Sequence, residues 1–217
     1  MRIDSKGNSW IAISEFHQQS YCEVQLKFKW QGIIRKTEKM IEGSDIHEQK
    51  FKDFLDETKE LEQVKIQDAI RRSIENNERF TGREVFIISP TFRLFGMIDS
   101  VEIGPEGVTI SDDKPSEFSF LSDKSQIIAY ATAFKDCYKP PLDIFMTIKN
   151  RDSGDITWED VLTQEWVDFL LEKINRLHEL ALGKREFEPT KNPKKCSACS
   201  YRNVCDMKIQ DLLSNQI

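Results

Sequence analysis

The sequence predicts a single α/β domain with a central mixed β-sheet flanked by helices. Two patterns indicate the sheet. Three strand-like runs within residues 85–111 are joined by turns, as in an antiparallel meander. A helical run at 120–135 separates this meander from a further strand at 142–148, and that order predicts a crossover connection. The length of 217 residues suits one hydrophobic core with a small appendage.

The first part of the chain is expected to be mainly helical. Residues 11–30 carry a mixed pattern, because their first half has helical spacing and their second half alternates as a strand would. No Gly or Pro interrupts this stretch, so we favour a helix that continues through Cys22. Residues 43–79 predict two helices, preceded by a loop at 42–44, with His47 near the start of the first helix.

The central part of the chain predicts three neighbouring antiparallel strands. Residues 85–89 form a short apolar run that ends before Pro90, and residues 92–103 are rich in strand-forming residues. Turn-forming residues at 104–107 then precede a further strand at 108–111. Strands joined by such short connections are expected to pair in one sheet.

The last third of the chain predicts a strand, a helix and a cysteine-rich tail. Residues 156–162 suit a strand, and residues 166–182 have the apolar spacing of an amphipathic helix. Gly183 follows at a position where glycine commonly ends helices. After Pro189 the sequence becomes basic and rich in cysteine, so we expect the tail to form a small appendage.

The composition is that of an ordinary globular protein. Hydrophobic residues make up 39% of the chain and charged residues 31%, which argues against disorder. No apolar run approaches the roughly 20 residues that cross a bilayer, and residues 1–13 lack a secretory signal, so we expect a cytoplasmic protein without membrane partners. In that reducing compartment, cysteines are expected to be metal ligands or reactive thiols rather than disulfides.

The net charge of −6 argues against a protein that coats DNA through a general basic surface. Basic residues outnumber acidic ones only locally, in residues 184–208. They are Lys184, Arg185, Lys191, Lys194, Lys195, Arg202 and Lys208. This stretch either contacts DNA or forms a solvated surface, and the sequence leaves both interpretations open.

Carboxylates and a lysine are expected to meet beside the predicted sheet. Asp99 lies on the second strand of the meander, and Asp112, Asp113 and Lys114 follow the third. Carboxylate oxygens are the ligands that Mg²⁺ and Mn²⁺ prefer, and such a metal polarises a phosphate and lowers the pKa of its bound water. A nearby lysine stabilises developing negative charge. The pattern suits phosphodiester hydrolysis, although Asp-x-Lys also occurs in charged turns.

Three further polar residues are candidates for the same site. Gln126 and Tyr130 are four residues apart on the predicted crossover helix, so they share one face and could bind phosphate or a base. They could equally be a polar residue beside a core tyrosine. The imidazole of His47 could supply a nitrogen ligand, which would make Mn²⁺ at least as acceptable as Mg²⁺.

The cysteines give the most specific pattern in the sequence. Cys196, Cys199 and Cys205 form a compact C-x2-C-x5-C group. A fourth ligand is needed for either a tetrahedral zinc site or an iron–sulfur cluster, and spacing does not choose between them. Cys22 and Cys137 are the candidates, and Cys137, at the end of the crossover helix, is more simply a buried thiol.

The order of these motifs resembles the PD-(D/E)XK nucleases of the RecB type. Within them the chain looks most like the iron–sulfur exonucleases associated with CRISPR adaptation. The resemblance covers nearly the whole chain, and the tail from Pro189 to Cys205 is its most specific part. The matching motifs are Cys22, a histidine at the end of 43–47, Gly96-x-x-Asp99, Asp112-x-Lys114, Gln126-x-x-x-Tyr130 and the terminal C-x2-C-x5-C.

This resemblance implies a role for each matching residue. The ligands of Mg²⁺ or Mn²⁺ would be His47, Asp99, Asp112 and the backbone carbonyl of Asp113. Lys114 would be the catalytic lysine, and Gln126 and Tyr130 would match the motif that binds DNA or aligns the site. The family usually has Glu where this chain has Asp112, whose side chain is one methylene shorter, so metal placement and activity level follow less directly from the family.

The resemblance also implies a cluster lobe. Cys22, Cys196, Cys199 and Cys205 would hold a 4Fe–4S cluster. The chain would then be one RecB-like domain, in which residues 1–42 and the tail 184–217 form the lobe and residues 43–183 form the nuclease core.

The implied activity is a Mg²⁺- or Mn²⁺-dependent DNA exonuclease that trims single-stranded ends for CRISPR spacer acquisition. Its partners would be DNA and the CRISPR integrase complex, and a homo-oligomer is compatible with the sequence. Two alternatives remain: a repair or replication nuclease with the same site, and a zinc-stapled DNA-binding module without catalysis.

Overall fold

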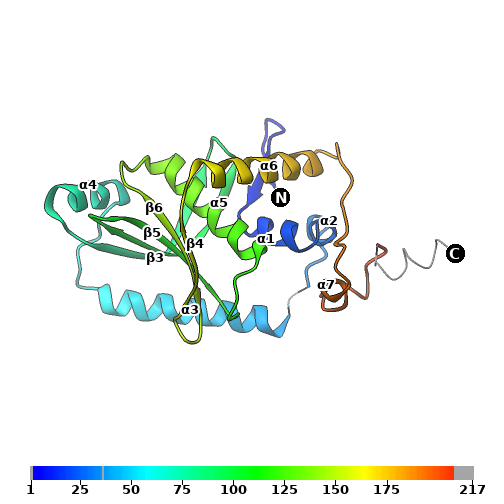
Figure 1. Cartoon of the computed structure of the whole chain (residues 1–217), viewed down its shortest axis with the longest axis horizontal. Coiled ribbons are helices and arrows are strands. Elements are labelled where there is room, and N and C mark those ends of the chain that lie inside the picture. Colours follow the sequence, from blue (N-terminus) through cyan, green and yellow to red (C-terminus); the bar gives the residue numbers. More distant parts are fainter. Residues whose placement is uncertain (1, 36, 208–217) are drawn as a thin grey trace.

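The computed structural model describes residues 2–35 and 37–207, and these residues form a central sheet with helices on both faces (Figure 1). The strands are β1 (Arg2–Ile3), β2 (Ser9–Ala12), β3 (Phe80–Ser89), β4 (Leu94–Gly104), β5 (Gly107–Lys114), β6 (Ile144–Asn150) and β7 (Ile156–Val161). The helices are α1 (Ser14–Tyr21), α2 (Val24–Trp30), α3 (Glu38–Thr58), α4 (Ile66–Asn76), α5 (Leu121–Tyr138), α6 (Gln164–Ala181) and α7 (Pro193–Ser197).

Within the described residues, one seven-stranded mixed sheet runs in the order β1-β2-β4-β5-β6-β7, with β3 also paired to β4. The predicted meander is confirmed, because β3, β4 and β5 pair antiparallel in sequence order. The predicted crossover is confirmed as well, since β5 and β6 pair in parallel and α5 connects them. The fold is therefore the α/β architecture with a mixed sheet that the sequence predicts.

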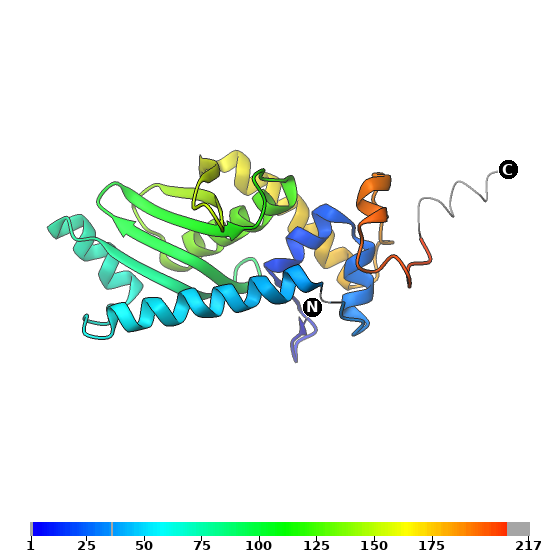
Figure 2. The same ribbon diagram turned by 90° about the horizontal axis from the view of Figure 1, so that it is seen from below.

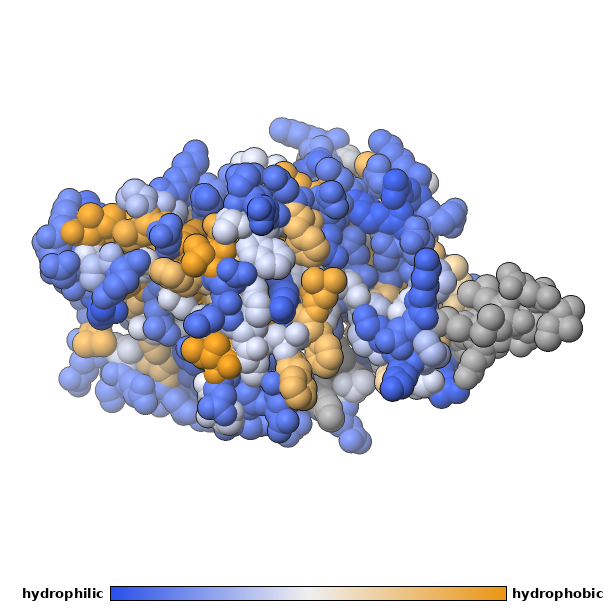
Figure 3. Space-filling view, viewed as in Figure 1, coloured by the Kyte–Doolittle hydropathy of each residue, from blue (hydrophilic) through white to orange (hydrophobic). Residues whose placement is uncertain are grey.

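The helices lie in two layers around the sheet. In Figure 1, α5 and α6 lie in front of the strands, whereas Figure 2 shows α3 running along the opposite face. The α5 side holds the main core, where Ile127, Ile128 and Phe134 of α5 are fully buried together with Ile98 and Ile110 of the sheet. The face shown in Figure 3 is mostly hydrophilic, with separate apolar patches. No helix among the described residues is long and apolar enough to cross a membrane.

The N-terminal helix prediction is wrong around Cys22. Residues 9–12 form strand β2, because Ile11 pairs with Leu94 of β4 and its side chain is fully buried. Helix α1 ends at Tyr21, and Cys22 has an extended backbone (φ −171°, ψ 118°) before α2 begins. The long-range strand pairing and the break at Cys22 outweigh the local helical pattern.

The loop predicted at residues 42–44 is also wrong, because α3 passes through it. Glycine inside a helix costs about 1 kcal/mol relative to alanine. At Gly43, however, a Cβ would lie 3.1 Å from a guanidinium nitrogen of Arg151, so the missing side chain permits a close approach. As a result His47 lies within the helix instead of near its start.

The two ends of the chain pack against each other in a second hydrophobic cluster. Val24 and Phe28 of α2 are buried with Tyr201 of the tail, and the Phe28 and Tyr201 rings stack with centroids 5.3 Å apart. The Tyr21 hydroxyl donates a 2.7 Å hydrogen bond to the carbonyl of Lys195. In Figure 2 the helices α1, α2 and α7 lie together at one end of the sheet. We call α1, α2 and residues 184–207 the terminal lobe.

Candidate active site

Strand β4 pairs with β3 along one edge, but on its other edge the partner changes from β2 to β5. The candidate site lies where this partner changes. Residues Ser100–Gly104 of β4 pair with β5, whereas Leu94 and Phe95 pair with β2. The last pair of β4 and β5 at this end is Ser100 with Ser111. Asp99 and Asp112 are the next residues beyond this pair, one on each strand. Because the two strands separate there, their backbones leave room for both carboxylates between them.

A histidine and two carboxylates gather on the α3 side of this point. His47 Nδ1 lies 3.3 Å from Glu84 Oε1, and His47 Nε2 lies 3.7 Å from Asp99 Oδ2. One ligand atom from each of these three residues falls within 4.8 Å of the others. One imidazole nitrogen and two carboxylate oxygens suit a divalent cation, and this donor set accepts Mn²⁺ as well as Mg²⁺.

Glu84 is the residue that sequence reasoning missed. The register, with Arg83 opposite Ser100 and Val85 opposite Ile98, places Glu84 across from Asp99. Its backbone is left-handed (φ 48°), an unfavourable conformation for glutamate that tends to occur at functional sites. No motif marks this glutamate, because its place beside Asp99 depends on the strand register.

Lys114 is held by two polar side chains on the inner side of the site. Its Nζ lies 2.7 Å from Asp112 Oδ2 and donates a 3.2 Å hydrogen bond to Gln126 Oε1. The contact with Asp112 is an ion pair without good hydrogen-bond alignment, since Oδ2 has no well-angled donor among the described residues. Asp112 is 2% exposed, so this ammonium is its principal compensating charge.

Tyr130 lies beneath the site rather than on its surface. It is buried against β4, where a Cβ on Gly96 would approach its ring to 2.8 Å. Burial and the charge of Asp112 raise the pKa of its hydroxyl, and a hydrogen bond with Gln126 opposes this shift. A buried, neutral phenol does not offer its ring to DNA, so the geometry favours alignment of Gln126 and Lys114 as its role.

Asp113 joins the two sides of the site. Its backbone N–H donates a 2.9 Å hydrogen bond to Asp99 Oδ2, and its carboxylate accepts a 2.7 Å bond from Lys50 of α3. The side chain of Asp113 is therefore engaged by α3. Ligation of a metal by its backbone carbonyl stays a prediction.

The electrostatics of the site favour a bound cation. Burial and the neighbouring Asp112 raise the pKa of Asp99 well above its usual value, although the Asp113 N–H and Lys114 act in the opposite direction. Burial lowers the pKa of Lys114, but its interaction with Asp112 and the charges of Asp99 and Asp123 together outweigh this effect, so the net shift is upward. Lys114 is thus a stable cation, while Asp99 ionises at a cost that a divalent metal would offset.

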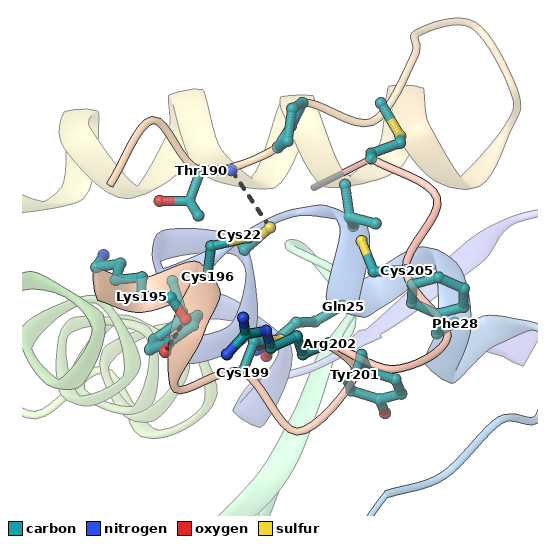
Figure 4. Close-up of a pocket in the computed structure, with 14 residues that line it drawn as sticks. Cys22, Gln25, Phe28, Thr190, Lys195, Cys196, Cys199, Tyr201, Arg202 and Cys205 are labelled. Carbon is teal, nitrogen blue, oxygen red and sulfur yellow. Dashed lines mark hydrogen bonds between the residues drawn. The ribbon is translucent and has the colours of Figure 1, made fainter. Parts of the chain in front are cut away.

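The four cysteines named in the sequence analysis line one cavity in the terminal lobe (Figure 4). Cys22 comes from the junction of α1 and α2, and Cys196, Cys199 and Cys205 come from the tail. The Thr190 N–H donates to Cys22 Sγ, and the Gln25 amide donates to Cys199 Sγ, both at 3.3 Å. All four thiols are free, so the donor set fits a thiolate-bound metal centre.

Cys137 lies outside these two sites, whereas the basic stretch contributes Lys195 and Arg202 to the lining of the cysteine cavity. The Cys137 thiol donates a 2.8 Å hydrogen bond to the carbonyl of Ile88, and it does not line the cysteine cavity. In the basic stretch, Arg185 pairs with Glu179 at 2.9 Å and Lys195 binds the carbonyl of Ser20. Lys208 lies outside the described residues.

Comparisons with known proteins agree with this arrangement. Residues 16–206 match a family model described as the PD-(D/E)XK nuclease superfamily. No curated protein matches the chain. A solved structure from Eubacterium rectale, provisionally named an exonuclease, is similar with a TM-score of 0.52 at 14% identity and covers 98% of both chains. That of SSO0001 has a TM-score of 0.45 at 14% identity, covering 95% of this chain and 90% of its own. At this identity the first likeness shows a shared fold alone.

The position of Glu84 predicts that it contributes to metal affinity. Glu84→Gln keeps the size of the side chain but removes its charge, so we expect Mn²⁺ to bind roughly tenfold to 100-fold more weakly. Isothermal titration with Mn²⁺ measures this change. Glu102→Gln is the control, because Glu102 is an exposed residue of β4 whose carboxylate lies 3.7 Å from Lys149. Equal Mn²⁺ affinity in wild type and Glu84→Gln would show that Glu84 is not a ligand.

The raised pKa of Asp99 predicts a pH-dependent stability effect. A carboxyl whose pKa is raised by folding contributes stability below its unfolded pKa, and this contribution is lost as the pH rises through the folded value. In EDTA, Asp99→Asn should therefore have a higher melting temperature than wild type at pH 8 and a smaller advantage at pH 5. Adding Mn²⁺ at pH 8 should narrow the gap. An equal or lower melting temperature for Asp99→Asn at pH 8 would contradict this electrostatic assignment.

Proposed function

Because the chain belongs to the PD-(D/E)XK nuclease superfamily, we propose that it is a Mg²⁺- or Mn²⁺-dependent DNA exonuclease acting on single-stranded ends. The observation that carries this proposal is the meeting of a cation site with a half-buried ammonium. His47, Glu84 and Asp99 form the candidate cation site, and Asp112 pairs with Lys114 next to it. Together they offer what phosphodiester hydrolysis requires, a metal and a fixed positive charge beside one phosphate.

The divalent metal, when bound, polarises the phosphate and lowers the pKa of its coordinated water. The protein's own residues then hold the reacting groups in place. His47, Glu84 and Asp99 supply the side-chain ligands on the α3 side, and Asp112 and the Asp113 carbonyl would complete them. The N–H of Asp113 fixes the Asp99 carboxylate through its 2.9 Å hydrogen bond.

Lys114 acts as a charge stabiliser in this proposal. Its raised pKa keeps it protonated near neutral pH, so it donates hydrogen bonds to the phosphate or the attacking water and does not accept a proton. Asp112 and Gln126 hold its Nζ from two directions. Tyr130 supports Gln126 from below. This preorganised ammonium is the kind of group that stabilises charge developing in a transition state.

We further propose that Cys22, Cys196, Cys199 and Cys205 hold a 4Fe–4S cluster that joins the two ends of the chain. The shared cavity, the free thiols and the N–H donors at two sulfurs support this assignment. Hydrogen bonds to thiolate sulfur are common around iron–sulfur centres and influence their potentials. The cluster would stabilise the terminal lobe, because metal binding that links distant segments contributes directly to folding.

The biological role proposed is the trimming of DNA ends for capture by the CRISPR integrase complex. This rests on the order of motifs and on the resemblance of the cysteine tail to the iron–sulfur exonucleases associated with CRISPR adaptation. A repair or replication nuclease would use the same site. Co-purification with an integrase supports the first role, whereas genes for DNA repair next to this one would favour the second.

Substitutions at the site test the activity directly. Asp99→Ala, Asp112→Ala and Lys114→Ala should each lower the rate of DNA degradation on the order of 100-fold or more, the scale for loss of an electrostatic group in an active site. The assay uses 5′- and 3′-labelled single strands with Mg²⁺ or Mn²⁺. Lys52→Ala is the control, since Lys52 is exposed on α3 and pairs with Glu48. Retained cleavage in all three variants would refute the site.

The cluster is tested by the metal content of the purified protein. Purified without oxygen, the protein should be brown and contain iron and acid-labile sulfide in equal amounts. Cys22→Ser should lose iron and melt at a lower temperature, whereas Cys137→Ser should retain it. A colourless protein with stoichiometric zinc would replace the cluster with a zinc site. Zinc without any nuclease activity would favour a DNA-binding module.

A further inference from the structure

Three large apolar side chains lie exposed on the sheet beside the candidate active site. Phe86 and Ile88 of β3 are 54% and 47% exposed, and Met97 of β4 is 41% exposed. Phe86 and Met97 are direct partners across the two strands. Ile88 lies two residues beyond Phe86, on the same side of β3. We call Phe86, Ile88 and Met97 the apolar strip.

The apolar strip lies on the same face of the sheet as the candidate metal ligands Glu84 and Asp99. Side chains alternate along a strand, so Phe86 shares a face with Glu84, and Met97 shares a face with Asp99. Burial agrees with this alternation, because Ile87 and Ile98 are buried in the core on the other face. Two residues of a strand span roughly 6–7 Å. The strip therefore begins about one such step from the carboxylates.

Helix α3 runs along this face of the sheet (Figure 2), yet the side chains of the apolar strip remain 41–54% exposed. It meets the strands through His47, which contacts Glu84 and Asp99, and through Lys50, which contacts Asp113. Phe86 nevertheless keeps more than half of its surface exposed. On a soluble protein, contiguous exposed apolar side chains next to a polar site are typical of a binding surface.

We propose that the apolar strip binds unstacked bases of single-stranded DNA beside the phosphate to be cleaved. This rests on the proposed nuclease function. A DNA strand whose phosphate reaches Asp99 and Glu84 must place adjoining nucleotides close to the site, and the strip offers an aromatic ring and two aliphatic side chains there. A single strand can turn its bases onto such a surface, whereas a duplex keeps them stacked and paired. The strip thus favours single-stranded over double-stranded ends.

Phe86 is the residue that tests this proposal. Removing an aromatic platform for a base usually weakens single-strand binding by roughly 5-fold to 100-fold. We expect Phe86→Ala to raise the Kd for a fluorescent single-stranded oligonucleotide by about tenfold on this scale, and Phe86→Trp to retain tight binding. Fluorescence anisotropy with Ca²⁺ in place of Mg²⁺ measures binding without turnover. Ile156→Ala is the control, since Ile156 is 55% exposed on β7.

An oligonucleotide with abasic sites at its end separates base contacts from phosphate contacts. Wild type should bind this strand more weakly than the normal one, whereas Phe86→Ala should bind both alike. Three results overturn the proposal: normal binding by Phe86→Ala, an equal loss on normal and abasic strands, or no binding of single strands by wild type. A change of oligomeric state in Phe86→Ala, seen by gel filtration, would instead assign the strip to contact between copies.

The same experiment separates this proposal from the nuclease function. If wild type degrades DNA with Mn²⁺ but Phe86→Ala binds single strands normally, base binding by the apolar strip is refuted and the nuclease activity is supported. If wild type degrades no DNA yet Phe86→Ala loses base-dependent binding, the nuclease activity is refuted and the apolar strip is supported as a DNA-binding surface.

Discussion

The candidate site depends on holding two carboxylates, the half-buried Asp99 and the buried Asp112, next to each other. Like charges in a poorly solvated place repel, and the raised pKa of Asp99 reports this repulsion together with its burial. Several features of the fold compensate. The separation of β4 from β5 makes room for the pair, Lys114 neutralises one member and the Asp113 N–H binds the other. This arrangement gives up stability in the metal-free protein, as active sites commonly do.

Helix α3 is attached to the rest of the molecule mainly through this charged site. None of its side chains that the structure describes is fully buried, so hydrophobic burial contributes less here than for α5. Among the described residues, His47 and Lys50 join α3 to the sheet through contacts with its carboxylates. Elements held by few buried contacts open most easily. The position of α3 is therefore coupled to the charge state of the site.

Much of the fold could be predicted because it follows from local patterns. Alternation, helical spacing and turn residues predict the meander, the crossover and the helix that precedes Gly183, and the structure confirms all three. The predictions were wrong where contacts between segments distant in sequence determine the local structure. Strand β2 exists because Ile11 pairs with β4, and the break at Cys22 precedes packing against the tail. No local pattern carries that information.

In the candidate site, too, some residues could be predicted from local motifs and others only from long-range strand pairing. Motif order predicted four candidates that the structure brings to one place: His47, Asp99, Asp112 and Lys114. Glu84 could not be named, since only the register of β3 with β4 sets it opposite Asp99. The apolar strip was hidden for the same reason. Phe86 and Met97 look like ordinary strand residues until the exposed face of the sheet is known.

The packing of Phe28 against Tyr201 has a consequence for the order of events during synthesis. Chains fold progressively as they leave the ribosome, with N-terminal units first. Here α2 emerges long before the tail, but Val24 and Phe28 are buried in a cluster with Tyr201, which lies 173 residues after Phe28. The sheet can assemble while the growing chain still exposes these apolar side chains. The terminal lobe therefore closes only after Tyr201 has been translated.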